Sequence, residues 1–82
     1  MDFLATIISL NESAEQIKNL SMQCSRNEYK ERINRMYDIH ASMKSLINDS
    51  LESSKETIKK AKRIVEELHD EIISMLDAYN EW

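Results

Sequence analysis

Glu66 and His69 form a Glu-x-x-His motif, the residue pattern in this chain with the clearest potential to bind a metal. In di-iron helical bundles, pairs with this spacing project from a helix into the core. Such a site needs a second pair, and the other histidine, His40, has Tyr37 at the corresponding position. We therefore expect no metal site, and we interpret His69 as a residue at the rim of an apolar helix face.

His40 and Cys24 are the other residues with reactive side chains. His40 falls on an apolar stripe, where a partly buried histidine bonded to a neighbour is the usual arrangement and a pH sensor is the alternative. Cys24 is the only cysteine, and a catalytic thiol needs an activating base and an oxyanion site. Because no such pattern accompanies Cys24, we expect it to be a small apolar seam residue, and we expect no cofactor and no enzyme activity.

The composition predicts one all-α domain over residues 1–82. Glycine and proline are absent from the 82 residues, so helices can run long and turns must come from Ser, Asn and Asp. The net charge of −4 argues against a nucleic-acid partner. Asp2 stands where a secretory signal would be basic, and the apolar runs are too short to span a membrane. We therefore expect a complete cytoplasmic protein.

Apolar residues recur at alternating steps of four and three, which places them along one face of a helix. This periodicity predicts three helices, over residues 3–24, 26–48 and 54–81. A serine followed three residues later by a glutamate is a capping box that marks the start of a helix. Ser25 with Glu28 and Ser53 with Glu56 match this pattern.

Two architectures fit these helices. In the first, the three helices fold into an antiparallel bundle. In the second, residues 26–81 form one rod of about 80 Å, calculated at 1.5 Å per residue, and a second chain covers the part that the first helix leaves bare. The series of apolar residues shifts by one position near Leu51, which favours a break between the second and third helices there. We expect self-association in both cases.

The third predicted helix carries bases in its first half and acids in its second half. This order opposes the helix dipole, and an antiparallel copy would offset it by setting Lys59 opposite Glu71 and Arg63 opposite Glu67. A solvated charged face is the alternative, and contact of the lysines at 55–63 with phosphates or a membrane surface is a minor option. The residues predicted to carry self-association and partner binding are Ile58, Val65, Leu68, Ile72, Met75, Tyr79, Trp82, Lys59, Arg63, Glu67 and Glu71.

Methionines and carboxyl-terminal aromatics are residue types that fit either a core or a binding surface. Methionine fills irregular gaps in cores and is also common on adaptable binding surfaces. Both interpretations are open for Met22, Met36, Met43 and Met75. Tyr79 and Trp82 either close the end of the bundle or anchor a partner, since aromatics are enriched at binding hot spots.

These patterns favour a non-enzymatic regulator or adaptor that self-associates and binds another protein through apolar helix faces. A helical bundle offers grooves and lacks the convergent polar pocket that catalysis needs. The alternative is a structural coiled-coil dimerisation module of a larger assembly. Around residues 28–72 the pattern resembles the helical-hairpin dimerisation regions of antiparallel microtubule crosslinkers. If the protein is such a module, we expect it only to pair with itself or to continue into a longer chain.

In its length, acidity and lack of glycine, the whole chain resembles the small accessory regulators of T-even bacteriophages. These include the lysis-inhibition accessory protein, a cytosolic antiholin. The resemblance rests on size and helical composition, and it assigns no residue a role. It implies a protein of the host cytoplasm that binds the cytosolic part of a membrane protein, the phage holin, and delays lysis.

Overall fold

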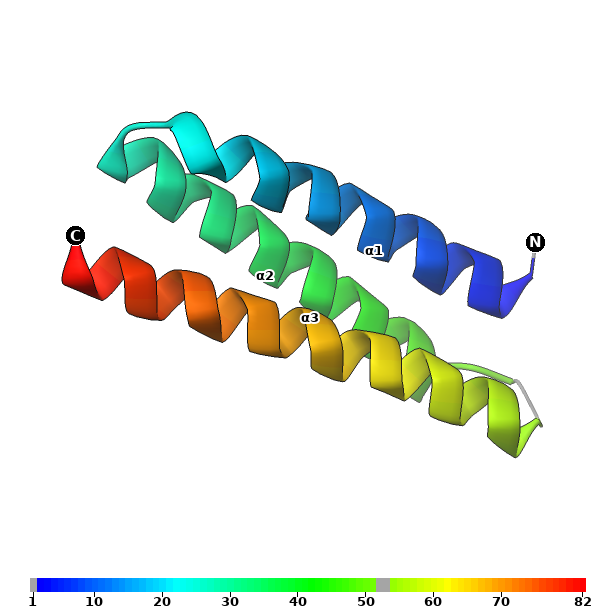
Figure 1. The fold of residues 1–82 in the computed structure, drawn as a ribbon. Helices are drawn as coiled ribbons and strands as arrows, with labels where there is room; N and C mark the ends of the chain where they lie inside the picture. The colour runs from blue at the N-terminus through cyan, green and yellow to red at the C-terminus, as the bar shows by residue number, and fades with distance from the viewer. Residues whose placement is uncertain (1, 52–53) are drawn as a thin grey trace.

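Residues 2–51 and 54–82, which the computed structural model describes, form a bundle of three α-helices. The side chain of Met22 lies outside this description. The helices are α1 (Phe3–Leu20), α2 (Arg26–Asn48) and α3 (Lys55–Glu81), and a short 3-10 turn, Ser21–Gln23, follows α1. The chain runs up, down and up, so the carboxyl terminus lies at the same end of the bundle as the α1–α2 turn (Figure 1). The all-α prediction is confirmed.

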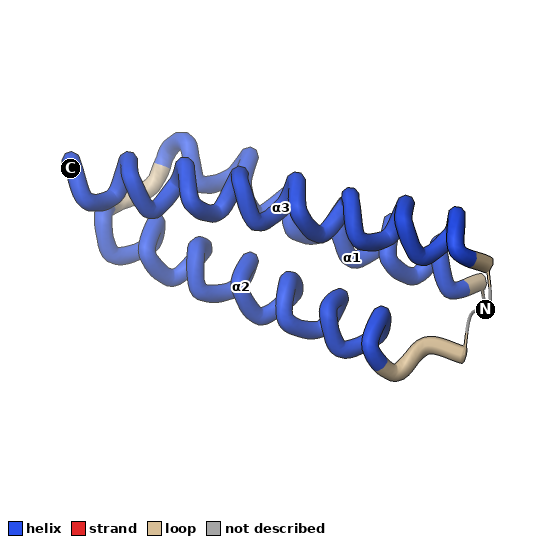
Figure 2. The backbone as a smooth tube through the Cα atoms, turned by 90° about the horizontal axis from the view of Figure 1, so that it is seen from below, coloured by secondary structure: helices blue, strands red, loops and turns tan. Residues whose placement is uncertain are grey.

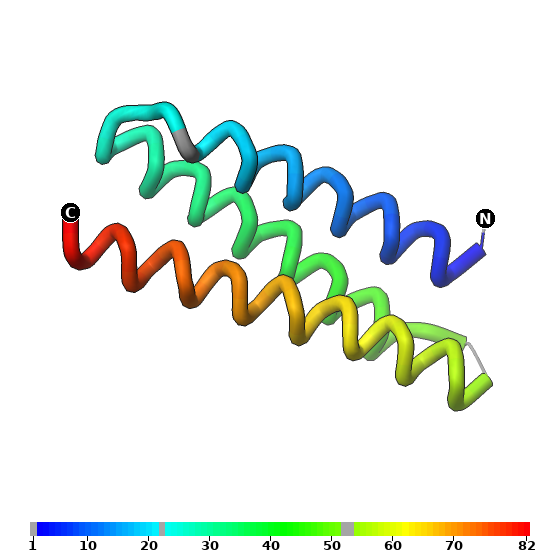
Figure 3. The backbone as a smooth tube through the Cα atoms, in the orientation of Figure 1, coloured from blue at the N-terminus to red at the C-terminus, as the bar shows by residue number. Residues whose placement is uncertain are grey.

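The helices form a triangular bundle in which each helix contacts the other two. Figure 3 shows α2 between α1 and α3, whereas the turned view in Figure 2 shows α3 in front of α1 with α2 to one side. The bundle measures 44 × 20 × 16 Å. Each helix therefore has one face toward a shared core. Within the described part of the chain, no helix combines the length and the apolar character needed to cross a membrane.

The predicted apolar stripes line the core between the helices. Burial of a large apolar side chain contributes about 1.5–3 kcal/mol, so these residues hold the bundle together. The buried hydrophobic residues are Ile7 and Ala14 from α1, Ile33, Met36 and Met43 from α2, and Ala61, Val65, Leu68, Ile72 and Met75 from α3. The described methionines Met36, Met43 and Met75 are thus core residues.

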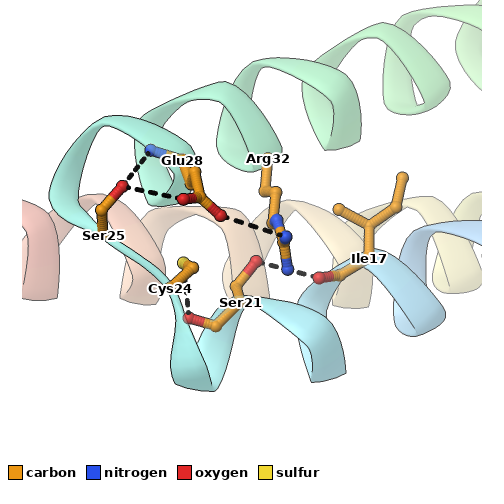
Figure 4. A network of polar contacts seen from close by, with 6 residues as sticks. All are labelled: Ile17, Ser21, Cys24, Ser25, Glu28 and Arg32. Atoms are coloured by element: carbon orange, nitrogen blue, oxygen red, sulfur yellow. Dashed lines mark hydrogen bonds and ion pairs between the residues drawn. The ribbon is translucent and has the colours of Figure 1, made fainter.

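The first helix ends earlier than the sequence predicts. The Ser21 hydroxyl donates to the Ile17 carbonyl at 2.9 Å, and the backbone then tightens into the 3-10 turn (Figure 4). Cys24 follows in an extended conformation (φ −141°, ψ 167°), and its Sγ donates to the Ser21 carbonyl at 3.1 Å. Helical backbone therefore continues to Gln23, close to the predicted end, but its last turn is a 3-10 helix, and Cys24 lies in the turn rather than on the helical seam.

The second and third helices are separate, so the continuous-rod alternative is wrong. The α2 helix ends at Asn48, and Asp49 takes the non-helical pair φ −91°, ψ 1°. The third helix begins at Lys55, where the Ser54 hydroxyl oxygen accepts from the Thr57 N–H at 3.3 Å. The predicted cap, Ser53, lies outside the described residues, and the residue that caps α3 is Ser54. This break lets α3 fold back along α2.

Candidate partner-binding site

Three aromatic rings gather where α2 begins and α3 ends. The Tyr29 and Tyr79 rings are nearly parallel, at 4°, with centroids 6.5 Å apart, and Trp82 meets Tyr29 edge to face at 5.2 Å. The Arg26 guanidinium lies over the Tyr79 ring, 4.2 Å from its centroid. Aromatic pairs at such distances contribute about 0.5–1.5 kcal/mol each beyond the area they bury. We call Arg26, Tyr29, Tyr79 and Trp82 the aromatic end.

The aromatic end leaves apolar surface uncovered. Trp82 is 57% exposed although it packs on Tyr29, and Leu20, the last residue of α1, is 65% exposed. Leu20 belongs to the same end of the bundle, because α1 finishes where the carboxyl terminus lies (Figure 1). Trp, Tyr and Arg are the residue types most enriched at binding hot spots. Tyr79 therefore helps to close the bundle, while Trp82 presents an ordered ring to solvent.

The start of α2 is capped by Ser25, and the Glu28 side chain reaches back to the Ser25 hydroxyl rather than to its backbone N–H (Figure 4). The Glu28 N–H donates to the Ser25 hydroxyl oxygen at 3.3 Å, and the Ser25 hydroxyl donates to Glu28 Oε1 at 3.2 Å. The other Glu28 oxygen pairs with Arg32 Nη2 at 3.6 Å. Because this network sets the first turn of α2, it also sets the positions of Arg26 and Tyr29 in the aromatic end.

A hollow of about 410 Å³ lies beside the aromatic end, between α1 and α3, and we call it the end hollow. Its lining residues are Lys18, Ser21, Tyr29, Asp70, Glu71, Ser74 and Met75. Because Tyr29 belongs to both features, the end hollow is continuous with the aromatic end. Burial, and then the nearby Cys24, raise the pKa of the Tyr29 hydroxyl above its usual 10.0. At neutral pH this hydroxyl therefore remains a hydrogen-bond donor.

The structure buries most of the apolar residues predicted to mediate self-association. Val65, Leu68, Ile72 and Met75 are at most 7% exposed, and Ile58 is half-buried. The physical reason is the break between α2 and α3, which lets α1 and α2 cover the stripe of α3 within one chain. These four buried residues belong to the core, so they offer no free seam to a second copy while the bundle is closed.

Three of the four charged residues predicted to pair between two chains already have partners within one chain. Arg63 Nε lies 3.4 Å from Glu67 Oε1 one turn along α3, and Glu71 Oε1 lies 3.4 Å from Lys18 Nζ on α1. Lys59 is exposed. Exposed pairs spaced four apart on a helix contribute only about 0.3–0.5 kcal/mol, so the Arg63–Glu67 pair is easily exchanged for another partner.

A second hollow lies between α2 and α3, and both histidines line it. Its volume is about 490 Å³, and its lining includes His40, His69, Lys44, Lys62 and Glu66. Within residues 2–51 and 54–82, no three His, Cys, Asp or Glu side chains are grouped in a way that could hold a metal ion. The Glu66–His69 pair thus lines a mixed-charge groove.

Sequence reasoning identified Tyr79 and Trp82 but missed Arg26, Tyr29 and Lys18. Tyr29 was recognisable only as the first member of the apolar stripe of α2. Its role follows from the antiparallel packing of α2 on α3, which brings residue 29 beside residue 79. The break between α2 and α3 makes the two helices antiparallel. Matching their apolar stripes outward from that break places Tyr29 beside Tyr79.

No family model, curated protein or solved structure matches this chain.

Proposed function

We propose that this protein is a non-enzymatic regulator that binds a partner protein at the aromatic end. The observation that carries the proposal is the state of Trp82, which is 57% exposed and yet packed at 5.2 Å against Tyr29. An aromatic ring that is already ordered loses little conformational entropy when a partner covers it. The adjoining end hollow has room for a side chain of that partner.

The proposed partner is the cytosolic segment of a membrane protein, and the resemblance to T-even phage regulators suggests a holin. The protein would then act from the host cytoplasm and delay lysis as an antiholin. An amphipathic segment of a partner can place its apolar anchors on exposed rings and in an adjoining groove. Trp82, Leu20 and the end hollow together supply such a surface.

A peptide-binding titration tests this proposal. A fluorescently labelled peptide of the holin's cytosolic segment is titrated with the wild-type protein, Trp82→Ala and Leu51→Ala. Loss of a hot-spot ring costs about 2 kcal/mol or more, so Trp82→Ala should weaken binding by roughly 30-fold. Leu51 is fully exposed at the opposite end of the bundle, so Leu51→Ala should bind like the wild type.

The titration separates the two parts of the proposal. Equal affinity of Trp82→Ala and the wild type would reject the aromatic end as the binding surface. No binding of the peptide by the wild type would reject the holin as the partner.

A second candidate function is a structural dimerisation module, and the exposed charges of α3 favour it. Lys59 and Arg63 precede Glu67 along an exposed face, so an antiparallel second copy would bring opposite charges together. Reversal of Lys59 and Arg63 to glutamate should then weaken self-association. Light scattering measures the mass of the particle, and a mass that is the same in the variant and the wild type contradicts this candidate.

A further inference from the structure

Three charged residues act on one another across the contact between α1 and α3. Glu15 and Lys18 are three residues apart on α1, so they share one face of that helix. Lys18 Nζ lies 3.4 Å from Glu71 Oε1 on α3. The second oxygen of the same carboxylate, Glu71 Oε2, is buried and has no hydrogen-bond partner among the described residues. The ion pair therefore satisfies only one side of the Glu71 carboxylate.

A buried carboxylate oxygen without a donor is costly, and most such atoms in folded proteins are hydrogen-bonded. Glu15 can provide the missing donor if its carboxyl group carries a proton. Two carboxyl groups at one site also resist double ionisation, because their like charges repel. Both effects favour the same arrangement, in which one proton is held between Glu15 and Glu71.

We propose that Glu15 and Glu71 share one proton and form a pH-sensitive latch between α1 and α3. The Glu15 O–H donates to the Glu71 carboxylate, and Lys18 balances the single remaining charge. In this protonated arrangement the hydrogen bond to Glu71, then burial and the Glu71 charge, raise the pKa of Glu15 from 4.5 to about 7, while Lys18 acts in the opposite direction. Asp70 on α3 and Tyr29 on α2 line the adjoining end hollow.

The direction of the pH effect follows from this raised pKa. The folded chain holds the proton more tightly than the unfolded chain does, so folding takes up a proton between about pH 4.5 and 7. The contribution of the latch is fully present below pH 4.5, declines as the pH rises, and is lost above about 7. Lys18 and Glu71 line the end hollow. Loss of the proton therefore weakens the contact between α1 and α3 at this hollow. The latch does not depend on the identity of the partner.

The first test is a direct titration of the wild-type protein by NMR. The carboxyl carbon of Glu15 is followed while the pH is raised from 3 to 9. The latch predicts a midpoint near 7, whereas a midpoint near 4.5, the ordinary value for a glutamate, would overturn the proposal. This measurement needs no substitution, so a variant that fails to fold cannot confound it.

The second test compares Glu15→Gln with Glu12→Gln. Both changes remove one negative charge from α1, but Glu12 is exposed and serves as the matched control. The amide of Glu15→Gln is a permanent donor to Glu71. At pH 8 its unfolding equilibrium constant should be lower than that of the wild type by on the order of tenfold, and at pH 5 the difference should vanish. If the two variants respond alike at pH 8, there is no latch.

Discussion

The imidazole rings of His40 and His69 lie 5.4 Å apart, centroid to centroid, across the contact between α2 and α3. His40 is only 9% exposed, and the Tyr37 ring meets it edge to face at 6.4 Å. Burial, then His69 and Lys44, lower the pKa of His40 below its usual 6.5. Burial in the bundle therefore favours the neutral form of the His40 ring.

Replacement of His40 by methionine should make the bundle less sensitive to acid. A histidine with a lowered pKa binds a proton more readily in the unfolded chain, so its stabilising contribution is present above pH 6.5 and is lost as the pH falls. Methionine fills a similar space and does not titrate. Urea unfolding at pH 7.5 and 5.5 measures the effect, and the wild type should lose more free energy of unfolding. An equal loss in both proteins contradicts the prediction.

Truncation of Leu68 tests the packing of the core. This side chain is 1% exposed in the middle of the bundle, so Leu68→Ala should lower the free energy of unfolding by about 2–5 kcal/mol. The milder change Ile72→Val should cost about 0.5–1.5 kcal/mol, and it remains measurable if Leu68→Ala unfolds. The control, Leu51→Ala, removes a fully exposed side chain and should stay within about 0.5 kcal/mol. Equal costs at Leu68 and Leu51 would contradict the closed bundle.

Loss of the cap at Ser25 should destabilise the bundle, because its hydroxyl accepts from the Glu28 N–H. We expect Ser25→Ala to cost about 1 kcal/mol and Ser25→Gly only a few tenths, since water reaches the freed amide more easily beside glycine. Thermal melts followed by circular dichroism measure both. If alanine and glycine cost the same, the cap does not determine the start of α2.

Most of the fold could be predicted from the periodicity of the apolar residues. The start of α2 at Arg26 and the burial of Ile33, Met36 and Leu68 follow from the four-and-three spacing and the Ser25 cap. The break after Asn48 could not be predicted uniquely, because no glycine or proline enforces it and apolar spacing continues on both sides. Packing between the helices decides in favour of the break, because one continuous helix would leave the apolar stripe of α3 exposed to water.

The candidate site was less predictable than the fold. The residue types alone marked Tyr79 and Trp82 as an end cap or an anchor, but their contact with Tyr29 joins residues about fifty positions apart. The same limit explains the predicted pairing of Glu71 with a second chain. Its partner is Lys18, and this pair forms only because α1 packs on α3.

The emission of Trp82 tests whether its ring rests on Tyr29. Trp82 is the only tryptophan in the chain, so its fluorescence reports on the aromatic end alone. Replacement of Tyr29 by leucine removes the ring that lies 5.2 Å away and should cost about 1 kcal/mol of stability. Trp82 should then emit at longer wavelength and be quenched more readily by acrylamide. Tyr37→Leu is the matched control, because Tyr37 packs near His40 and its loss should leave the emission unchanged. Identical spectra for the two variants would mean that Tyr29 does not hold the Trp82 ring. The aromatic end would then not be an ordered binding surface.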